Sequence, residues 1–172
     1  IAPNAAAAYS LRSLTGGDPK VVRVRRDTDG GAGDNDEQDF TASGISSGAL
    51  VAFVGSGNDG FVETWYDQSG NSKDAVQATA GSQPKIVNAG SLVVDSAGLP
   101  EIDFDGSNDC LTASSYSRSG EDLPLTMISV FDQDVAGVDY VVSLSQTNNN
   151  AFDRILLRTD SFDYGRRATD NS

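Results

Sequence analysis

Residues 60–71 read Gly60-Phe61-Val62-Glu63-Thr64-Trp65-Tyr66-Asp67-Gln68-Ser69-Gly70-Asn71, and they are the most informative part of the sequence. An apolar run carries the only tryptophan of the chain directly into a polar turn that contains a glycine. The pattern predicts a buried β-strand whose end presents an aromatic pair beside a polar loop.

Two interpretations of this strand end stay open. A flat indole ring covers the C–H groups of a sugar while Asp and Asn side chains bind its hydroxyls, so the strand end suits a carbohydrate. The alternative is a packing tryptophan above an ordinary tight turn, because aromatic residues in strands most often belong to the core. The predicted carbohydrate-binding residues are Trp65, Tyr66, Asp67, Gln68, Asn71 and Asp74.

Composition favours a single all-β domain. A chain of 172 residues is long enough for one well-buried domain and too short for two comfortable ones. Its 18 glycines and 22% charged residues, with many Ser, Thr, Asn and Asp, are typical of a fold with many turns. We therefore predict one domain over residues 1–172, and the start at Ile1 without an initiator methionine predicts a fragment or a processed product.

Charge and residue types exclude several function classes. The chain has 25 acidic and 12 basic residues and a net charge of -13, which disfavours nucleic acids and anionic membranes as partners. It has no histidine, which removes the usual general base and the Ser-His and Cys-His pairs. The single Cys110 forms no internal disulfide, and no apolar stretch approaches membrane-spanning length.

Local patterns predict two short helices near the N-terminus and strands further on. The first helix runs from Pro3 to Leu14, before Gly16-Gly17, and the second runs from Ser46 to Gly55. Residues 27–39 are predicted to form a long acidic loop. The predicted strands are Val21–Arg26, Phe61–Tyr66, Lys85–Val87, Leu92–Val94, Glu101–Phe104, Thr126–Phe131, Tyr140–Leu144, Arg154–Arg158 and Phe162–Gly165. Their short spacing favours a sandwich.

Six motifs occur in order over residues 5–110, namely Ala8-Tyr9-Ser10-Leu11-Arg12, Val22-Arg23-Val24-Arg25-Arg26, Trp65-Tyr66-Asp67-Gln68-Ser69-Gly70-Asn71, Asp74-Ala75, Gln83-Pro84-Lys85-Ile86-Val87 and Phe104-Asp105-Gly106-Ser107-Asn108-Asp109. This series resembles one known group, the concanavalin A-like (laminin-G-like) jelly-roll domains of phage and bacterial surface proteins. Its Tyr-Asp-Gln-Ser-Gly-Asn turn is similar to one in the catalytic jelly roll of arabinofuranosidase-B-type glycosidases.

This resemblance implies a jelly-roll sandwich of two antiparallel sheets with one or two short N-terminal helices. It implies a non-catalytic module on a virion or cell surface, acting either in glycan recognition and adhesion or as a structural decoration or fibre component. Expected partners are a glycan or other virion or surface proteins, and a homo-oligomer is one expected assembly. The chain ends at Asn171-Ser172, before the last strands of such a sandwich, which predicts a truncated domain or completion by another chain.

A glycoside hydrolase, or a fragment of one, is the alternative function. In a strand over Glu101-Ile102-Asp103-Phe104-Asp105, alternation places Glu101, Asp103 and Asp105 on one face. Retaining glycosidases use two carboxyl groups about 5 Å apart, and the segment resembles the Glu-x-Asp-x-Glu strand of laminarinase-type glucanases. Asp105 stands where that family has a glutamate, and the cysteine pair of the arabinofuranosidases is missing.

The same region offers ligands for a metal ion. Asp103, Asp105, Asn108 and Asp109 supply hard oxygen atoms on a sharp turn, which is the chemistry that Ca²⁺ prefers. The alternative is that these Asp and Asn side chains cap their own backbone in solvent. We therefore name Ca²⁺ as the candidate cofactor at these four residues.

Overall fold

The computed structural model describes residues 5–114, 126–131, 140–145, 154–158 and 162–165. The chain folds as two compact units, Ile1–Arg118 and Ser119–Ser172. The described chain is mostly antiparallel β-strand with two short α-helices, which confirms the all-β prediction. None of the helices in the described ranges is both long and apolar enough to cross a membrane.

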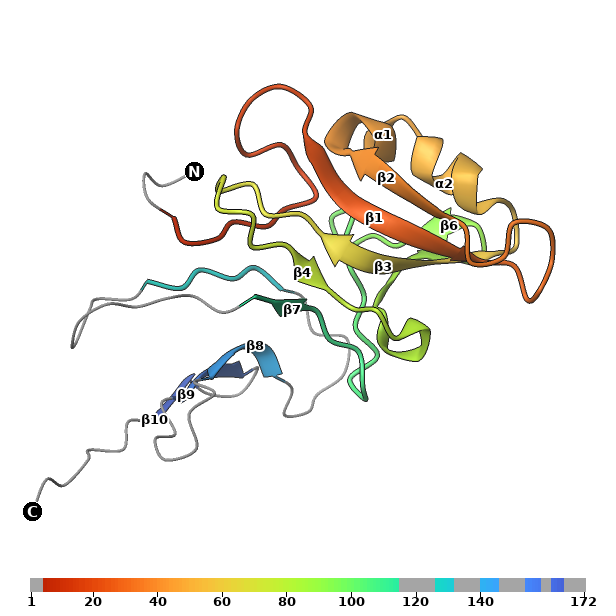
Figure 1. Ribbon diagram of the computed structural model, residues 1–172. Helices are drawn as coiled ribbons and strands as arrows, with labels where there is room; N and C mark the ends of the chain where they lie inside the picture. The colour runs from red at the N-terminus through yellow and green to blue at the C-terminus, as the bar shows by residue number, and fades with distance from the viewer. Residues whose placement is uncertain (1–4, 115–125, 132–139, 146–153, 159–161, 166–172) are drawn as a thin grey trace, which may run out of the picture. The chain divides into compact units, whose positions relative to one another are not determined.

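The first unit is built on one antiparallel sheet (Figure 1). Strand β1 (Lys20–Asp27) lies between β2 (Glu37–Thr41) and β3 (Asp59–Trp65). The other edge of β3 pairs with β5 (Lys85–Asn88) at the start of β3 and with β4 (Ala75–Val76) at its end. Strand β6 (Ser91–Leu92) pairs with β5, and β7 (Thr112–Ala113) pairs with β4.

Two short helices connect β2 to β3. Helix α1 (Ala42–Ser46) begins after Thr41, whose side-chain oxygen accepts a hydrogen bond from the Gly44 N–H at 3.0 Å. Helix α2 (Ala49–Val54) ends at Gly55, which has a φ of 87°. The single helix predicted over residues 46–55 is therefore wrong at its start, because Gly48 in the left-handed region separates two helices there. A 3₁₀ turn, η1 (Ala80–Ser82), precedes β5.

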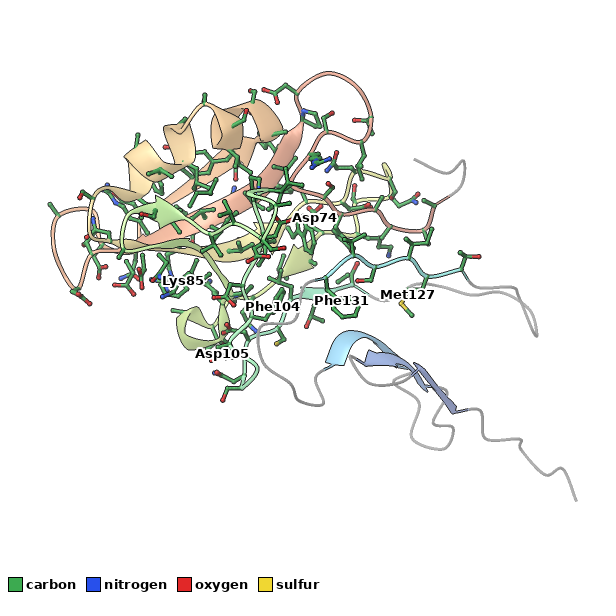
Figure 2. The ribbon with its side chains drawn as sticks, turned by 180° about the vertical axis from the view of Figure 1, so that it is seen from behind. Asp74, Lys85, Phe104, Asp105, Met127 and Phe131 are labelled. Atoms are coloured by element: carbon green, nitrogen blue, oxygen red, sulfur yellow. The ribbon has the colours of Figure 1, made fainter. Side chains whose placement is uncertain are left out.

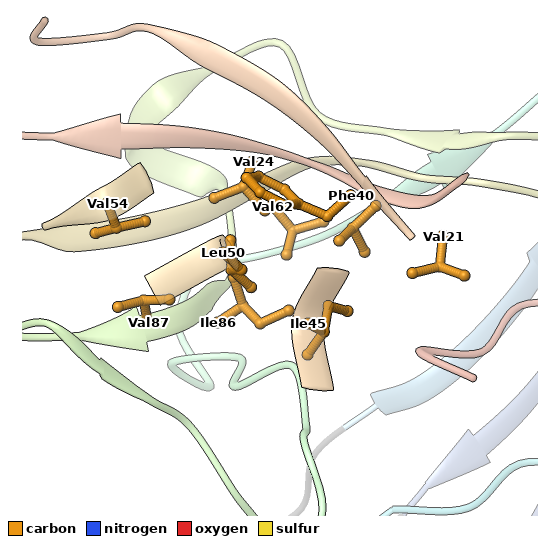
Figure 3. Close-up of a cluster of buried hydrophobic side chains, with 10 residues drawn as sticks. Val21, Val24, Phe40, Ile45, Leu50, Val54, Val62, Ile86 and Val87 are labelled. Carbon is orange, nitrogen blue, oxygen red and sulfur yellow. The ribbon is translucent and has the colours of Figure 1, made fainter. Parts of the chain in front are cut away.

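The hydrophobic core lies between the sheet and these helices (Figure 3). Gly60 shows how closely they pack, because a Cβ atom at this position would lie 2.8 Å from Val54 Cγ2 and 3.1 Å from Val87 Cβ. Gly60, Val62 and Thr64 are buried on the α2 side of β3. Alternation therefore places Phe61 on the opposite face of the sheet. The buried core residues are Val21, Val22, Val24, Phe40, Ile45, Leu50, Val54, Val62, Ile86 and Val87.

The second unit contains a three-stranded antiparallel sheet in the order β10-β9-β8. Its strands are β8 (Tyr140–Ser145), β9 (Arg154–Arg158) and β10 (Phe162–Gly165), which confirms three of the four strands predicted in this unit. The strand predicted over Thr126–Phe131 is wrong, because these residues form no ladder with any other described segment.

Three further predictions about the first unit are corrected. Residues 5–14 form no helix, because the side chains of Asp67, Gln68 and Asn71 form hydrogen bonds with the backbone of this segment. Residues 101–104 form no strand, and one isolated bridge between Asp103 and Lys85 stands in its place. Part of the predicted acidic loop, residues 37–39, belongs to β2. The predicted strands at β1, β3, β5 and β6 are confirmed, with small shifts of their ends.

Candidate functional site

The predicted site residues lie at the two ends of the first unit. Trp65 ends β3, and the loop that follows it carries the remaining predicted carbohydrate-binding residues. Asp103, Asp105 and Asp109 line a pocket near Phe61, at the start of β3. Figure 2 shows Lys85 and Asp105 toward one end of this unit and Asp74 toward the other. We call residues 66–74 the Asp67 loop and residues 5–14 the N-terminal segment.

The ring of Trp65 lies against the N-terminal segment. The Tyr9 and Trp65 ring centroids are 5.5 Å apart with an interplanar angle of 43°, and the Tyr9 hydroxyl donates to the Lys73 carbonyl. Trp65 also packs against the hydrophobic core, and its Nε1 is buried without a hydrogen-bond partner among the described residues. Trp65 is therefore held between Tyr9 and the core.

Asp67 organises the loop that bears its name. Its carboxylate accepts hydrogen bonds from the Ala8 N–H at 2.9 Å, the Lys73 N–H at 3.0 Å, and the N–H and hydroxyl of Ser69 at 2.8 and 2.7 Å. Burial opposes ionisation of Asp67, but these donors outweigh it and lower the pKa of the carboxyl. All four donors belong to the chain itself, so the carboxylate is engaged within the fold.

Gln68 and Asn71 bind the backbone of the N-terminal segment. The Gln68 side chain is buried, donates to the carbonyls of Ser10 and Arg12 at 2.9 Å each, and accepts from the Leu14 N–H at 2.8 Å. Its own N–H donates to the Ala8 carbonyl at 2.7 Å. The Asn71 amide donates to the Ala5 and Ala6 carbonyls at 2.9 and 3.2 Å. These bonds replace the i to i−4 bonds of a helix, which explains the irregular course of residues 5–14.

Tyr66 and Asp74 are also engaged with protein groups. The Asp74 side chain accepts from the Asp67 N–H at 2.9 Å, and the Tyr66 hydroxyl donates to Asp39 at 2.7 Å. Burial and the bond to Asp39 raise the pKa of Tyr66. A hydrogen bond from Arg23 holds the pKa of Asp39 far below its ordinary value, although burial opposes this. Carbohydrate binding at the Asp67 loop stays a prediction, and most of the polar groups that it would use are bonded to the chain.

The pocket at the start of β3 is built on a row of residues paired across the sheet. Phe61 lies opposite Arg25 on β1 and opposite Lys85 on β5, and Lys85 is bridged to Asp103 by two backbone hydrogen bonds of 2.8 Å. We call these four residues the Phe61 row. Arg25 Cζ lies 4.9 Å and Lys85 Nζ lies 5.5 Å from the centroid of the Phe61 ring. Cations therefore lie over the aromatic ring from both neighbouring strands.

The pocket around this row has a volume of about 450 Å³. It combines an aromatic ring, two cations, one amide and four carboxylates with the backbone of η1. Its lining residues are Arg25, Asp27, Phe61, Ala80, Gly81, Gln83, Lys85, Asp103, Asp105 and Asp109. A concave site with an apolar ring and several polar groups is the usual form of a small-ligand site.

The pKa values of two acids on the 103–109 turn are shifted in opposite directions. Hydrogen bonds from the backbone N–H groups of Ser107, Asn108 and Asp109 lower the pKa of Asp105. Burial and the nearby charge of Asp105 raise the pKa of Asp109, whose carboxylate accepts from the Asp105 N–H at 3.0 Å. The Asn108 amide donates to Gly81 and Ser82 of η1, at 2.8 and 3.0 Å. These bonds fix the turn against the pocket.

The geometry of the 103–109 turn agrees only in part with the predicted Ca²⁺ site and with the predicted catalytic strand. Asp103, Asp105 and Asp109 share the pocket, but no group of three or more His, Cys, Asp or Glu side chains in the described ranges is placed to hold a metal ion. Ca²⁺ at this turn stays a prediction. The catalytic hypothesis relied on a regular strand over residues 101–105, which is not formed, and Glu101 is not among the residues that line the pocket.

Comparisons with known proteins found no match for the chain, whether among protein-family models, curated proteins or solved structures.

Sequence reasoning did not bring Arg25, Phe61, Gln83 and Lys85 together in one pocket. The alternation Val22-Arg23-Val24-Arg25 places Arg25 on one face of β1, so a partial signal exists. The pairing of Arg25, Phe61 and Lys85 depends on the register of three strands that are distant in sequence. No local pattern gives this register.

Proposed function

We propose that this chain is a non-catalytic jelly-roll module on a virion or cell surface and that it recognises glycans. The observation that carries the proposal is the pocket around the Phe61 row, on the face of the sheet opposite α2. Half-buried aromatic surface beside hydrogen-bonding groups of both kinds suits a sugar, which has apolar C–H groups and many hydroxyls.

Two further observations support this proposal. The antiparallel sheets with short helices agree with the β-rich architecture that the motif resemblance implies. The strongly acidic surface keeps such a module soluble and away from phosphate-rich polymers, while it tolerates neutral glycans. The jelly-roll sandwich, in which two antiparallel sheets pack face to face, is part of the proposal.

A glycan array tests the proposal. The purified chain is applied to a broad array in buffer with Ca²⁺ and again with a chelator, and its folding is checked by circular dichroism. We expect saturable binding to one class of glycan. Loss of that binding in the chelator would place Ca²⁺ at the site. A folded sample that binds no glycan would contradict recognition and favour a structural role with protein partners.

The same preparations separate recognition from hydrolysis. Bound glycans are recovered and analysed for shortened products by mass spectrometry. We expect intact glycans. Release of shortened products that stops in a folded Glu101→Gln variant would support the hydrolase alternative instead.

A further inference from the structure

Arg25 presents an unsatisfied donor at the pocket. The residue is only 6% exposed, yet it lines the pocket. Its Nε donates to Gln83 at 2.8 Å, and its Nη1 lies 3.3 Å from Asp27 and 3.0 Å from Asn35. Its Nη2 has no hydrogen-bond partner in the part of the chain that the structure describes. Nη2 is not among the buried polar atoms that lack a partner, so it is accessible in the pocket, and an oxygen atom of a ligand would replace water as its acceptor there.

Asp103 presents the complementary acceptor at the other end of the Phe61 row. Its backbone is fixed by the two hydrogen bonds to Lys85, but its carboxylate has no hydrogen-bond partner among the described residues. Adjacent strands lie about 4.8 Å apart, so the backbones of Arg25 and Asp103 are separated by about 14 Å across three spacings. Phe61 and Lys85 lie between them.

The charges of the pocket select the kind of ligand. Four carboxylates and two cations line it. Arg25 is paired with Asp27, and Lys85 is paired at 2.8 Å with Asp59, which is not a lining residue. The remaining carboxylates therefore leave the pocket negative. Such a pocket repels the carboxylate of an acidic sugar, while its oxygen atoms accept hydrogen bonds from hydroxyls.

We infer that this pocket is a subsite for a neutral sugar unit. Arg25 Nη2 donates to an oxygen atom of the sugar, Asp103 accepts from a hydroxyl, and the part of the half-buried Phe61 ring that Arg25 and Lys85 leave uncovered contacts the C–H groups of the sugar. This inference rests on the proposed glycan recognition and adds the location of the site and the class of sugar. It also separates the recognition site from the Asp67 loop.

Protein-observed NMR tests the inference. The ¹⁵N-labelled chain is titrated with glucose, galactose, mannose and arabinose as neutral probes and with glucuronic acid as the anionic probe. We expect at least one neutral sugar to shift the amide signals of Gly81, Gln83 and Lys85, and glucuronic acid to leave them unchanged. Shifts confined to Ala8, Gln68 and Leu14 would overturn the inference, and so would equal binding of glucuronic acid.

Two variants define the contacts. Asp103→Asn leaves the backbone bridge intact and is expected to weaken binding of the neutral sugar by about tenfold, the usual size of a lost hydrogen bond to a charged group. Arg25→Lys keeps the charge, removes Nη2 and is expected to weaken binding by a similar factor. Asp29→Asn is the matched control, because it changes the charge equally at an exposed residue outside the pocket.

The outcomes distinguish the two proposals. If the chain binds a glycan on the array and Asp103→Asn binds it with unchanged affinity, the pocket assignment is wrong and glycan recognition stands. If neither the array nor the titration shows binding by the folded chain, both proposals are wrong.

Discussion

Strand β3 carries one aromatic side chain near each end, and the surroundings of the two rings differ. At its Trp65 end, Tyr9 covers the aromatic ring, and the polar side chains of the Asp67 loop bind the backbone of the N-terminal segment. At its Phe61 end, the aromatic ring lies beside a pocket, and Arg25 Nη2 and the Asp103 carboxylate have no partner in the described chain. Aromatic and polar side chains therefore hold the fold together at the Trp65 end, whereas similar side chains remain accessible to a ligand at the Phe61 end.

The difference shows that the partners of a polar side chain, rather than its type, decide whether it is free to bind a ligand. Gln68, with three side-chain hydrogen bonds to the backbone, is 6% exposed and has little capacity left for a hydroxyl. Asp103 is exposed and has that capacity. Variants at the two ends of β3 should accordingly affect different quantities: stability at the Trp65 end and ligand affinity at the Phe61 end.

Trp65→Ala should give the largest effect and should lower the free energy of unfolding by about 3–5 kcal/mol, because it removes a large side chain packed between Tyr9 and the core. Chemical denaturation measures this loss. Trp65→Phe is the control, since it keeps a ring against Tyr9 and removes the buried N–H that has no described partner. A Trp65→Ala variant of normal stability that no longer binds glycan would identify Trp65 as a sugar platform and contradict its assignment as a packing residue.

Gln68→Ala should lower the free energy of unfolding by about 2–3 kcal/mol, because it leaves the carbonyls of Ser10 and Arg12 and the Leu14 N–H without their partner. Hydrogen exchange measures the local effect, and we expect the Leu14 amide to lose protection. Gln68→Glu keeps the acceptor for Leu14 and removes the two donors, so an intermediate loss is expected. Unchanged exchange at Leu14 in Gln68→Ala would show that other contacts hold the N-terminal segment.

Asp39→Asn should cost about 1–2 kcal/mol at pH 7, because Asp39 accepts hydrogen bonds from Arg23 and Tyr66. The pKa of this carboxyl is lowered in the folded chain, so its contribution is fully present above the ordinary Asp pKa of about 4 and is lost as pH falls through the lower folded pKa. Thermal unfolding from pH 7 to pH 2 should show the two proteins converging in acid. Asp103→Asn, at an exposed carboxylate, should show a smaller difference at pH 7.

The strands could be predicted where local alternation or apolar runs are strong. Strands β1, β3 and β5 combine β-branched residues with flanking turn residues, which the sequence displays directly. Strand β2 was missed because its Glu37-Gln38-Asp39 start continues an acidic stretch, and β4 and β7 because each has two residues. Their pairing partners, rather than their own residues, make them strands.

Long-range contacts explain the remaining errors. The alanines of residues 5–8 favour a helix by propensity, but the groups that bind this segment lie about 60 positions away, between Asp67 and Asn71. The predicted acids at 103, 105 and 109 do reach one pocket. Arg25 and Phe61, which line the same pocket, come from strands whose register depends on bulges in the pairing of β1, which no local pattern reveals.

Among the described strands, β2 lies at the end of the strand order, and this position bears on self-association. A strand at an edge offers unpaired backbone groups to other chains and is a common starting point for amyloid-like growth. Here that edge is five residues long and begins with Glu37 and Gln38, both exposed, on a chain of net charge -13. A second copy approaching this edge meets like charge, so we expect stacking into fibrils to be slower at neutral pH than in acid or at high salt.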